Sequence, residues 1–177
     1  MPWLNNLVHR FTHKDVDVAA IQGKIELHSA TNDDLLDYVT DIEHRTKQMV
    51  QDLQSIYKKY EISFTGFRSL EMACDFLRSS IKNGKEEVYN NLIKIEPMVT
   101  SEQQRHVALI SMAVTSNGKR VLDQIKQDPE SKQKFVGVFG ERDASGQMKG
   151  DGAYQRLASE IHKLSEYILL QKNKIYH

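Results

Sequence analysis

An all-α helical bundle is the fold that this sequence predicts, and three observations lead to it. Apolar residues recur at alternating spacings of three and four over most of the chain, which is the period of one helix face. Only 3 prolines and 9 glycines occur in 177 residues. Hydrophobic residues make up 40% of the chain and charged residues 27%, a composition typical of a folded domain. We expect residues 1–177 to form one antiparallel domain of about six or seven helices.

Residues 1–14 are expected to form a short amphipathic helix. Its apolar face consists of five side chains: Trp3, Leu4, Leu7, Val8 and Phe11. Such a face can dock into a groove of a partner protein or lie on a membrane surface. With only Arg10 and Lys14 as fixed positive charges, attraction to anionic lipid is weak, which disfavours the membrane. Trp3, Leu4, Leu7 and Phe11 are the partner-binding residues that we expect, and capping of the bundle's own core is the competing interpretation.

The clearest periodicity predicts a long central helix over residues 33–60, about 40 Å in length at 1.5 Å per residue. Eight residues alternate at spacings of four and three and form what we call the 35–60 seam: Leu35, Val39, Ile42, Thr46, Met49, Leu53, Ile56 and Tyr60. Thr31 is placed to cap the first turn, where Asp33 and Asp34 complement the helix dipole. We expect the seam to be the core face of the bundle, and a homodimer joined through it is the alternative.

Three shorter stripes follow in the middle of the chain. The first is a row at the same helical spacing: Phe67, Leu70, Cys74, Leu77 and Ile81. Asn83-Gly84 should end that helix, because glycine tolerates the left-handed conformation that a helix end requires. The second stripe is Val88, Leu92 and Ile95, and we expect Pro97 to stop it. The third is Val107, Ile110 and Val114.

The last part of the chain combines a glycine-rich segment with a closing helix. Val121, Leu122 and Ile125 form a short stripe that ends at Asp128-Pro129. Residues 137–152 hold five of the nine glycines and match neither a phosphate-binding loop nor a calcium loop. We expect a surface connector there, with a functional loop as the alternative. A helix over residues 153–175 should close the bundle, with one apolar stripe: Tyr154, Leu157, Ile161, Leu164, Ile168 and Ile175.

Charge and cysteine content exclude several classes of function. The net charge is zero and the pI is about 7.1, so the basic surface of a nucleic-acid binder is missing. One cysteine cannot form an internal disulfide, which suits a reducing, cytoplasmic location. Cys74 lies in an apolar stripe and should be a buried, unreactive thiol. Neither a signal peptide nor a run of 18 apolar residues is present in the sequence, so we expect neither export nor membrane spanning.

Two pairs of potential metal ligands have the spacing that puts both side chains on one helix face. They are Glu102 with His106 and His162 with Glu166. If the two pairs faced each other they could bind zinc, iron or manganese. The spacing differs from that of the di-iron carboxylate bundles, which use Glu-x-x-His twice with two further glutamates.

These observations favour a non-catalytic protein-protein interaction module, such as an adaptor, inhibitor or regulator that binds its partner through a helical surface. The reasons are the neutral charge and the absence from the sequence of a serine-hydrolase, nucleotide or dinucleotide motif. No cofactor is expected under this interpretation. A metal-binding helical-bundle enzyme is the first alternative, and a peripheral membrane protein held by residues 1–14 is the second.

Overall fold

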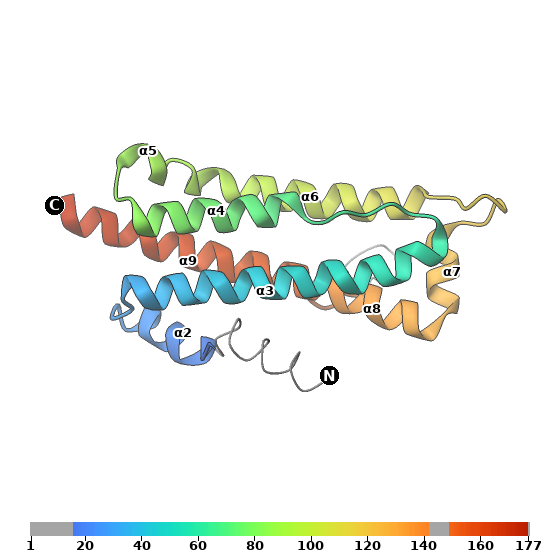
Figure 1. The fold of residues 1–177 in the computed structure, drawn as a ribbon, viewed down its shortest axis with the longest axis horizontal. Coiled ribbons are helices and arrows are strands. Elements are labelled where there is room, and N and C mark those ends of the chain that lie inside the picture. Colours follow the sequence, from blue (N-terminus) through green and yellow to red (C-terminus); the bar gives the residue numbers. More distant parts are fainter. Residues whose placement is uncertain (1–15, 142–148, 177) are drawn as a thin grey trace, which may run out of the picture.

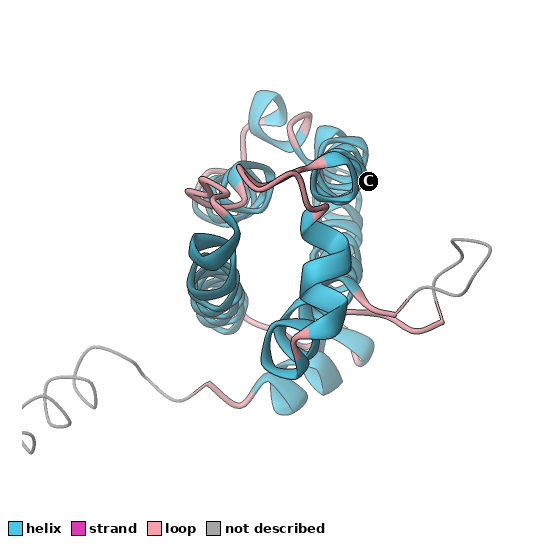
Figure 2. Cartoon of the chain, turned by 90° about the vertical axis from the view of Figure 1, so that its right-hand side faces the viewer, coloured by secondary structure: helices cyan, strands magenta, loops and turns pink. Residues whose placement is uncertain are grey.

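Four long antiparallel helices carry the fold, and the structure, a computed structural model, describes residues 16–141 and 149–176. These helices are α3 (Asn32–Tyr57), α4 (Arg68–Lys82), α6 (Leu92–Met112) and α9 (Ala153–Tyr176). Each packs against the next, and α9 closes against α3 (Figure 1). Seen end on, they surround a common axis (Figure 2), along which their apolar side chains form one buried cluster. The predicted all-α bundle is confirmed.

Short helices complete the two ends of the bundle. α2 (Val18–Glu26) packs against α3, and α5 (Glu86–Tyr89) connects α4 to α6. α7 (Val121–Gln127) and α8 (Pro129–Phe139) lie at the end of the bundle farther from the C-terminus (Figure 1). None of the helices in the described ranges combines the length and the hydropathy needed to cross a lipid bilayer.

The long central helix begins as its sequence predicts. The Thr31 hydroxyl accepts a hydrogen bond from the Asp34 amide, and the Asp34 carboxylate accepts one from the Thr31 amide, which forms a capping box. The helix tightens into the 3₁₀ turn Lys58–Tyr60 at its other end. All eight residues of the 35–60 seam are buried within the chain. The seam is therefore the core face of the bundle and has no exposed surface to offer a second copy.

α6 corrects the boundary predicted at Pro97. The proline is the sixth residue of the helix, where it removes one backbone hydrogen bond without ending the helix. The apolar stripes predicted on either side of it belong to one helix. Its core row continues at helical spacing through two polar residues: Leu92, Ile95, Val99, Glu102, His106 and Ile110. Val114, predicted to extend this row, instead lies in the turn after α6, where it is 58% exposed and pairs with Arg120 in an isolated antiparallel bridge.

Two predictions about glycines also need correction. Gly84 does not adopt a positive φ, and the chain leaves α4 through an extended Asn83. The expected loop over residues 137–152 begins three residues later than predicted, because Val138 and Phe139 are buried at the end of α8. Gly140 follows with a φ of 78°. A Cβ atom on Gly152 would lie 2.2 Å from the Val138 carbonyl oxygen, so the base of this connection needs a residue without a side chain.

Candidate functional site

The predicted partner-binding residues Trp3, Leu4, Leu7 and Phe11 lie outside the described residues. Their role as an anchor therefore stays a prediction. The other candidate residues can be placed. They fall into an internal polar cluster, a surface cluster on α6 and α9, and a groove between those two helices.

Glu102 and His106 share one face of α6, as their spacing predicts, and that face points into the core. One Glu102 carboxylate oxygen accepts a hydrogen bond from the Ser69 amide at 2.8 Å. The other accepts one from the Tyr154 hydroxyl, also at 2.8 Å. Burial, together with the nearby Glu102 charge, raises the pKa of Tyr154 above its usual range, so the phenol remains a donor. Glu102 thus joins α6 to α4 and α9.

His106 is enclosed by aromatic rings. Its imidazole stacks on the rings of Tyr57 and Phe139, with centroids 5.6 and 5.1 Å away, and the edges of Phe64 and Phe67 contact it. Burial lowers the pKa of His106 to about 4 and raises that of Tyr57. Both groups are therefore neutral at pH 7, and a hydrogen bond of 2.8 Å joins the Tyr57 hydroxyl to Nε2 of His106. This arrangement suits a core contact better than acid-base catalysis.

His162 and Glu166 form a separate cluster on the surface. Nε2 of His162 lies 3.1 Å from Glu166, and Nδ1 lies 3.4 Å from Glu96 on α6. The two carboxylates therefore occupy opposite edges of one imidazole ring and do not converge on a common point. All three side chains are about half exposed or more.

The structure does not bring together the four ligands of the alternative, metal-binding interpretation. Glu102 and His106 are engaged inside the bundle, whereas His162 and Glu166 contact each other and Glu96 outside it. Among residues 16–141 and 149–176 there is no group of three or more histidine, cysteine or acidic side chains arranged to hold a metal ion. The helical spacing places each pair on one helix face, but one face points into the bundle and the other out to solvent.

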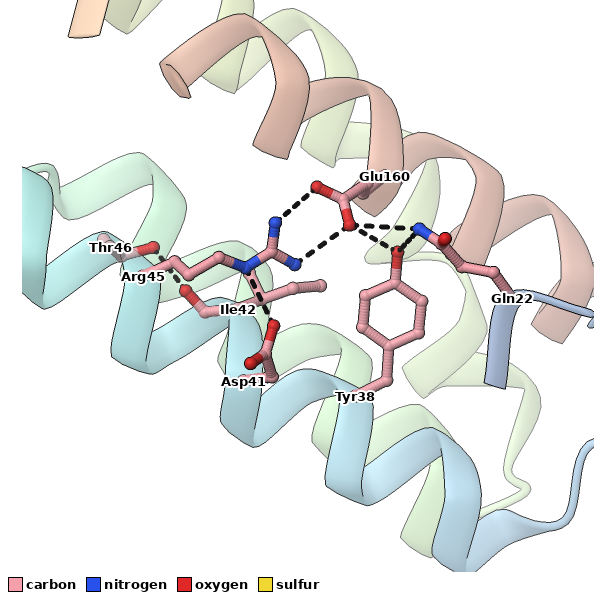
Figure 3. A network of polar contacts seen from close by, with 7 residues as sticks. All are labelled: Gln22, Tyr38, Asp41, Ile42, Arg45, Thr46 and Glu160. Atoms are coloured by element: carbon pink, nitrogen blue, oxygen red, sulfur yellow. Dashed lines mark hydrogen bonds and ion pairs between the residues drawn. The ribbon is translucent and has the colours of Figure 1, made fainter. Parts of the chain in front are cut away.

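A second polar network ties α2, α3 and α9 together (Figure 3). The Arg45 guanidinium donates to both Glu160 oxygens, at 2.7 and 2.9 Å, and to Asp41 at 2.8 Å. The Tyr38 hydroxyl and the Gln22 amide also donate to Glu160. Every member has a partner, so the network fixes the order of the helices. Nothing in it was predicted from the sequence, since its members come from three distant segments.

Cys74 has the role predicted for it. It is buried in α4 with 1% of its surface exposed, and burial raises the pKa of its thiol to about 12. A thiol that stays protonated is neither a nucleophile nor a metal ligand at pH 7.

An apolar groove of about 480 Å³ lies between α6 and α9, and we call it the α6–α9 groove. Its floor consists of apolar side chains from both helices: Leu92, Ile95, Val99, Ala158 and Leu169. Thr100, Ser159 and Ser165 also line it, and these side chains are too small to fill the space between the helices. Ile93 stands at its edge, 68% exposed.

Charged groups border this groove. Glu96 on α6 and His162, Lys163 and Glu166 on α9 line it, so the surface histidine cluster belongs to its rim.

The sequence contains a signal for the face of α9 that lines the groove. Gln155, Ala158, His162, Ser165 and Leu169 alternate at spacings of three and four and form a second row beside the core row of α9.

Comparisons with protein-family models, with curated proteins and with solved structures found no match to this chain.

Proposed function

We propose that this protein is a non-catalytic interaction module whose α6–α9 groove receives an amphipathic helix of a partner protein. The observation that carries this proposal is an apolar floor left open between two antiparallel helices, with Ile93 exposed at its edge. Recognition of a helix in such a groove uses apolar anchors one turn apart. The charged rim formed by Glu96, Lys163 and Glu166 would select the flanking residues of the partner.

The internal chemistry supports binding over catalysis. His106, Tyr57 and Cys74 are held neutral by burial, and each is packed within the core. Within the described residues, the polar clusters have hydrogen-bond partners that link helices. These groups stabilise the scaffold on which the groove is built. A reducing compartment such as the cytosol is the location that we propose, since the one cysteine is an unpaired, buried thiol.

Site-directed photocrosslinking tests the proposal. A photoreactive amino acid at position 93, introduced in cells that naturally contain the protein, should capture one partner. The same amino acid at position 27 is the matched control, because Leu27 is also an exposed apolar residue, at 79%, and does not line the groove.

Affinity measurements with the captured partner then test whether the α6–α9 groove is the binding surface. Ile93→Glu should weaken binding at least about tenfold, because it places a charge against an apolar contact, whereas Leu27→Glu should bind like the unmodified protein. Equal affinities for the two variants would show that the groove is not the binding surface.

The amphipathic segment 1–14 is a second predicted contact. Deleting it should reduce affinity for the same partner without lowering the melting temperature. A drop of many degrees in that temperature would instead identify Trp3, Leu7 and Phe11 as part of the bundle's own core.

A further inference from the structure

A pocket of about 230 Å³ lies between α6, α7 and α8, and it shares no residue with the α6–α9 groove. Its inner wall contains Val107, Ile125 and Phe139, which are all buried. Lys126, Lys132 and Glu141 also line it. The pocket therefore combines an apolar wall with charged groups.

The inner wall is fixed in place by the rest of the core. The Phe139 ring stacks on His106 with centroids 5.1 Å apart and contacts Phe135 at 5.2 Å. Only 1% of Phe139 is exposed. The ring cannot turn into the pocket without leaving these contacts, so the space exists before any ligand arrives.

The charged groups carry an excess of positive charge. Lys126 on α7 and Lys132 on α8 are both exposed and line the same pocket. No carboxylate in the described part of the chain forms an ion pair with either ammonium group. By contrast Lys134, on the same helix as Lys132, is paired with Glu130. The lining residues thus include one carboxylate, that of Glu141, and two lysines.

We propose that this pocket binds a small molecule with an apolar body and one anionic head, such as an alkyl carboxylate. The body contacts Val107, Ile125 and Phe139, and the head is attracted by Lys126 and Lys132. Pockets for drug-sized ligands enclose about 300–1,000 Å³, so the occupant of this smaller pocket is a chain of about eight carbons. This binding is independent of the partner protein proposed for the α6–α9 groove.

Two probes of equal chain length separate the apolar and electrostatic contributions. Octanoate and 1-octanol are titrated into the full-length protein while methyl NMR signals of Val107 and Ile125 are followed. Octanoate should bind roughly tenfold more tightly than octanol, and added salt should reduce that difference. Equal affinities, or shifts confined to residues elsewhere, would overturn the proposal.

Charge variants locate the head group. The double variant K126Q/K132Q should lower octanoate affinity to that of octanol and leave octanol affinity unchanged. The control K82Q/K94Q removes two positive charges at the opposite end of the bundle, where α4 ends and α6 begins, and should behave like the unmodified protein. Octanoate binding that survives K126Q/K132Q, or falls equally in the control, would contradict the assignment.

A variant that fills the pocket checks the apolar part. Ser111 lines the pocket and is half-buried, so Ser111→Phe should abolish binding of both probes. Helicity and melting temperature are measured on the same sample. If the folded variant still binds octanol with unchanged affinity, the apolar chain does not occupy this pocket.

Discussion

His106 is a partly buried histidine in aromatic surroundings. It is neutral, stacked between Tyr57 and Phe139, and bonded to the Tyr57 hydroxyl. An imidazolium in this position would lose its hydration and gain no carboxylate partner. Because burial disfavours the charged form, the pKa of His106 is lowered to about 4, against 6.5 for the free side chain.

This pKa makes stability depend on pH. Between pH 6.5 and about 4 the unfolded chain binds a proton at residue 106 and the folded chain does not. The stability associated with neutral His106 is therefore complete above pH 6.5 and is lost as the pH falls towards 4, by up to about 3 kcal/mol.

The substitution His106→Gln isolates this effect, because an amide can still form a hydrogen bond with the Tyr57 hydroxyl but does not titrate. Urea unfolding at pH 7 and pH 4.5 should show that the unmodified protein loses about 2–3 kcal/mol more than the variant. If both proteins lose the same free energy, His106 is not held neutral in the folded state.

At the residue scale, the sequence identifies rows of side chains but not the surface that each row faces. The spacing of Glu102 and His106 correctly places them on one helix face. Because both are polar, they appear to interrupt the apolar row of α6, although they continue it. Their partners come from three other segments: Ser69, Tyr57 and Tyr154. The sequence of α6 alone therefore does not predict these contacts.

At the scale of helices, Pro97 tests how α6 is built. A proline inside a helix costs up to about 3 kcal/mol relative to alanine, and its missing amide would otherwise bond the Ile93 carbonyl. Pro97→Ala should raise the free energy of unfolding by roughly 1–3 kcal/mol, measured by urea denaturation. No increase would indicate that the helix that begins at Leu92 ends at Pro97, as the sequence alone predicts.

Gly152 tests the base of the connection between α8 and α9. Gly152→Ala would push a methyl group against the Val138 carbonyl and the Gly140 amide, and should lower stability by about 2 kcal/mol or more. Gly23→Ala is the matched control, since a Cβ there meets nothing within 4 Å inside α2. It should raise stability by about 0.5–1 kcal/mol. Thermal unfolding that changes in the same direction for both variants would contradict this description.

The boundaries of α3 and α9 could be predicted because each has a long apolar row, and α3 also has a cap at Thr31. The boundaries of α6 and α8 could not. In α6 the proline predicts a helix end, but tertiary packing continues the helix through it. In α8 the glycines at 137 and 140 predict a loop, although the helix extends to the buried Phe139. Helix ends of this kind depend on contacts with the rest of the bundle more than on the local sequence.

At the scale of the whole molecule, the up-and-down order of α3, α4 and α6 follows from their apolar rows and from the short connections between them. The longer connection from α6 to α9 contains α7 and α8, which pack against each other at one end of the bundle. The apolar rows explain where the core lies. They do not reveal the α6–α9 groove, because it arises from small side chains on two helices that are far apart in the sequence.

The central claim is that a partner helix docks in the α6–α9 groove. Hydrogen exchange of the protein, alone and with the partner captured at position 93, tests it most directly. Docking in the groove should slow exchange severalfold in residues 92–100 and 155–169 and leave α3 unchanged. Protection confined to α3 and α4, or to residues 1–14, would contradict it.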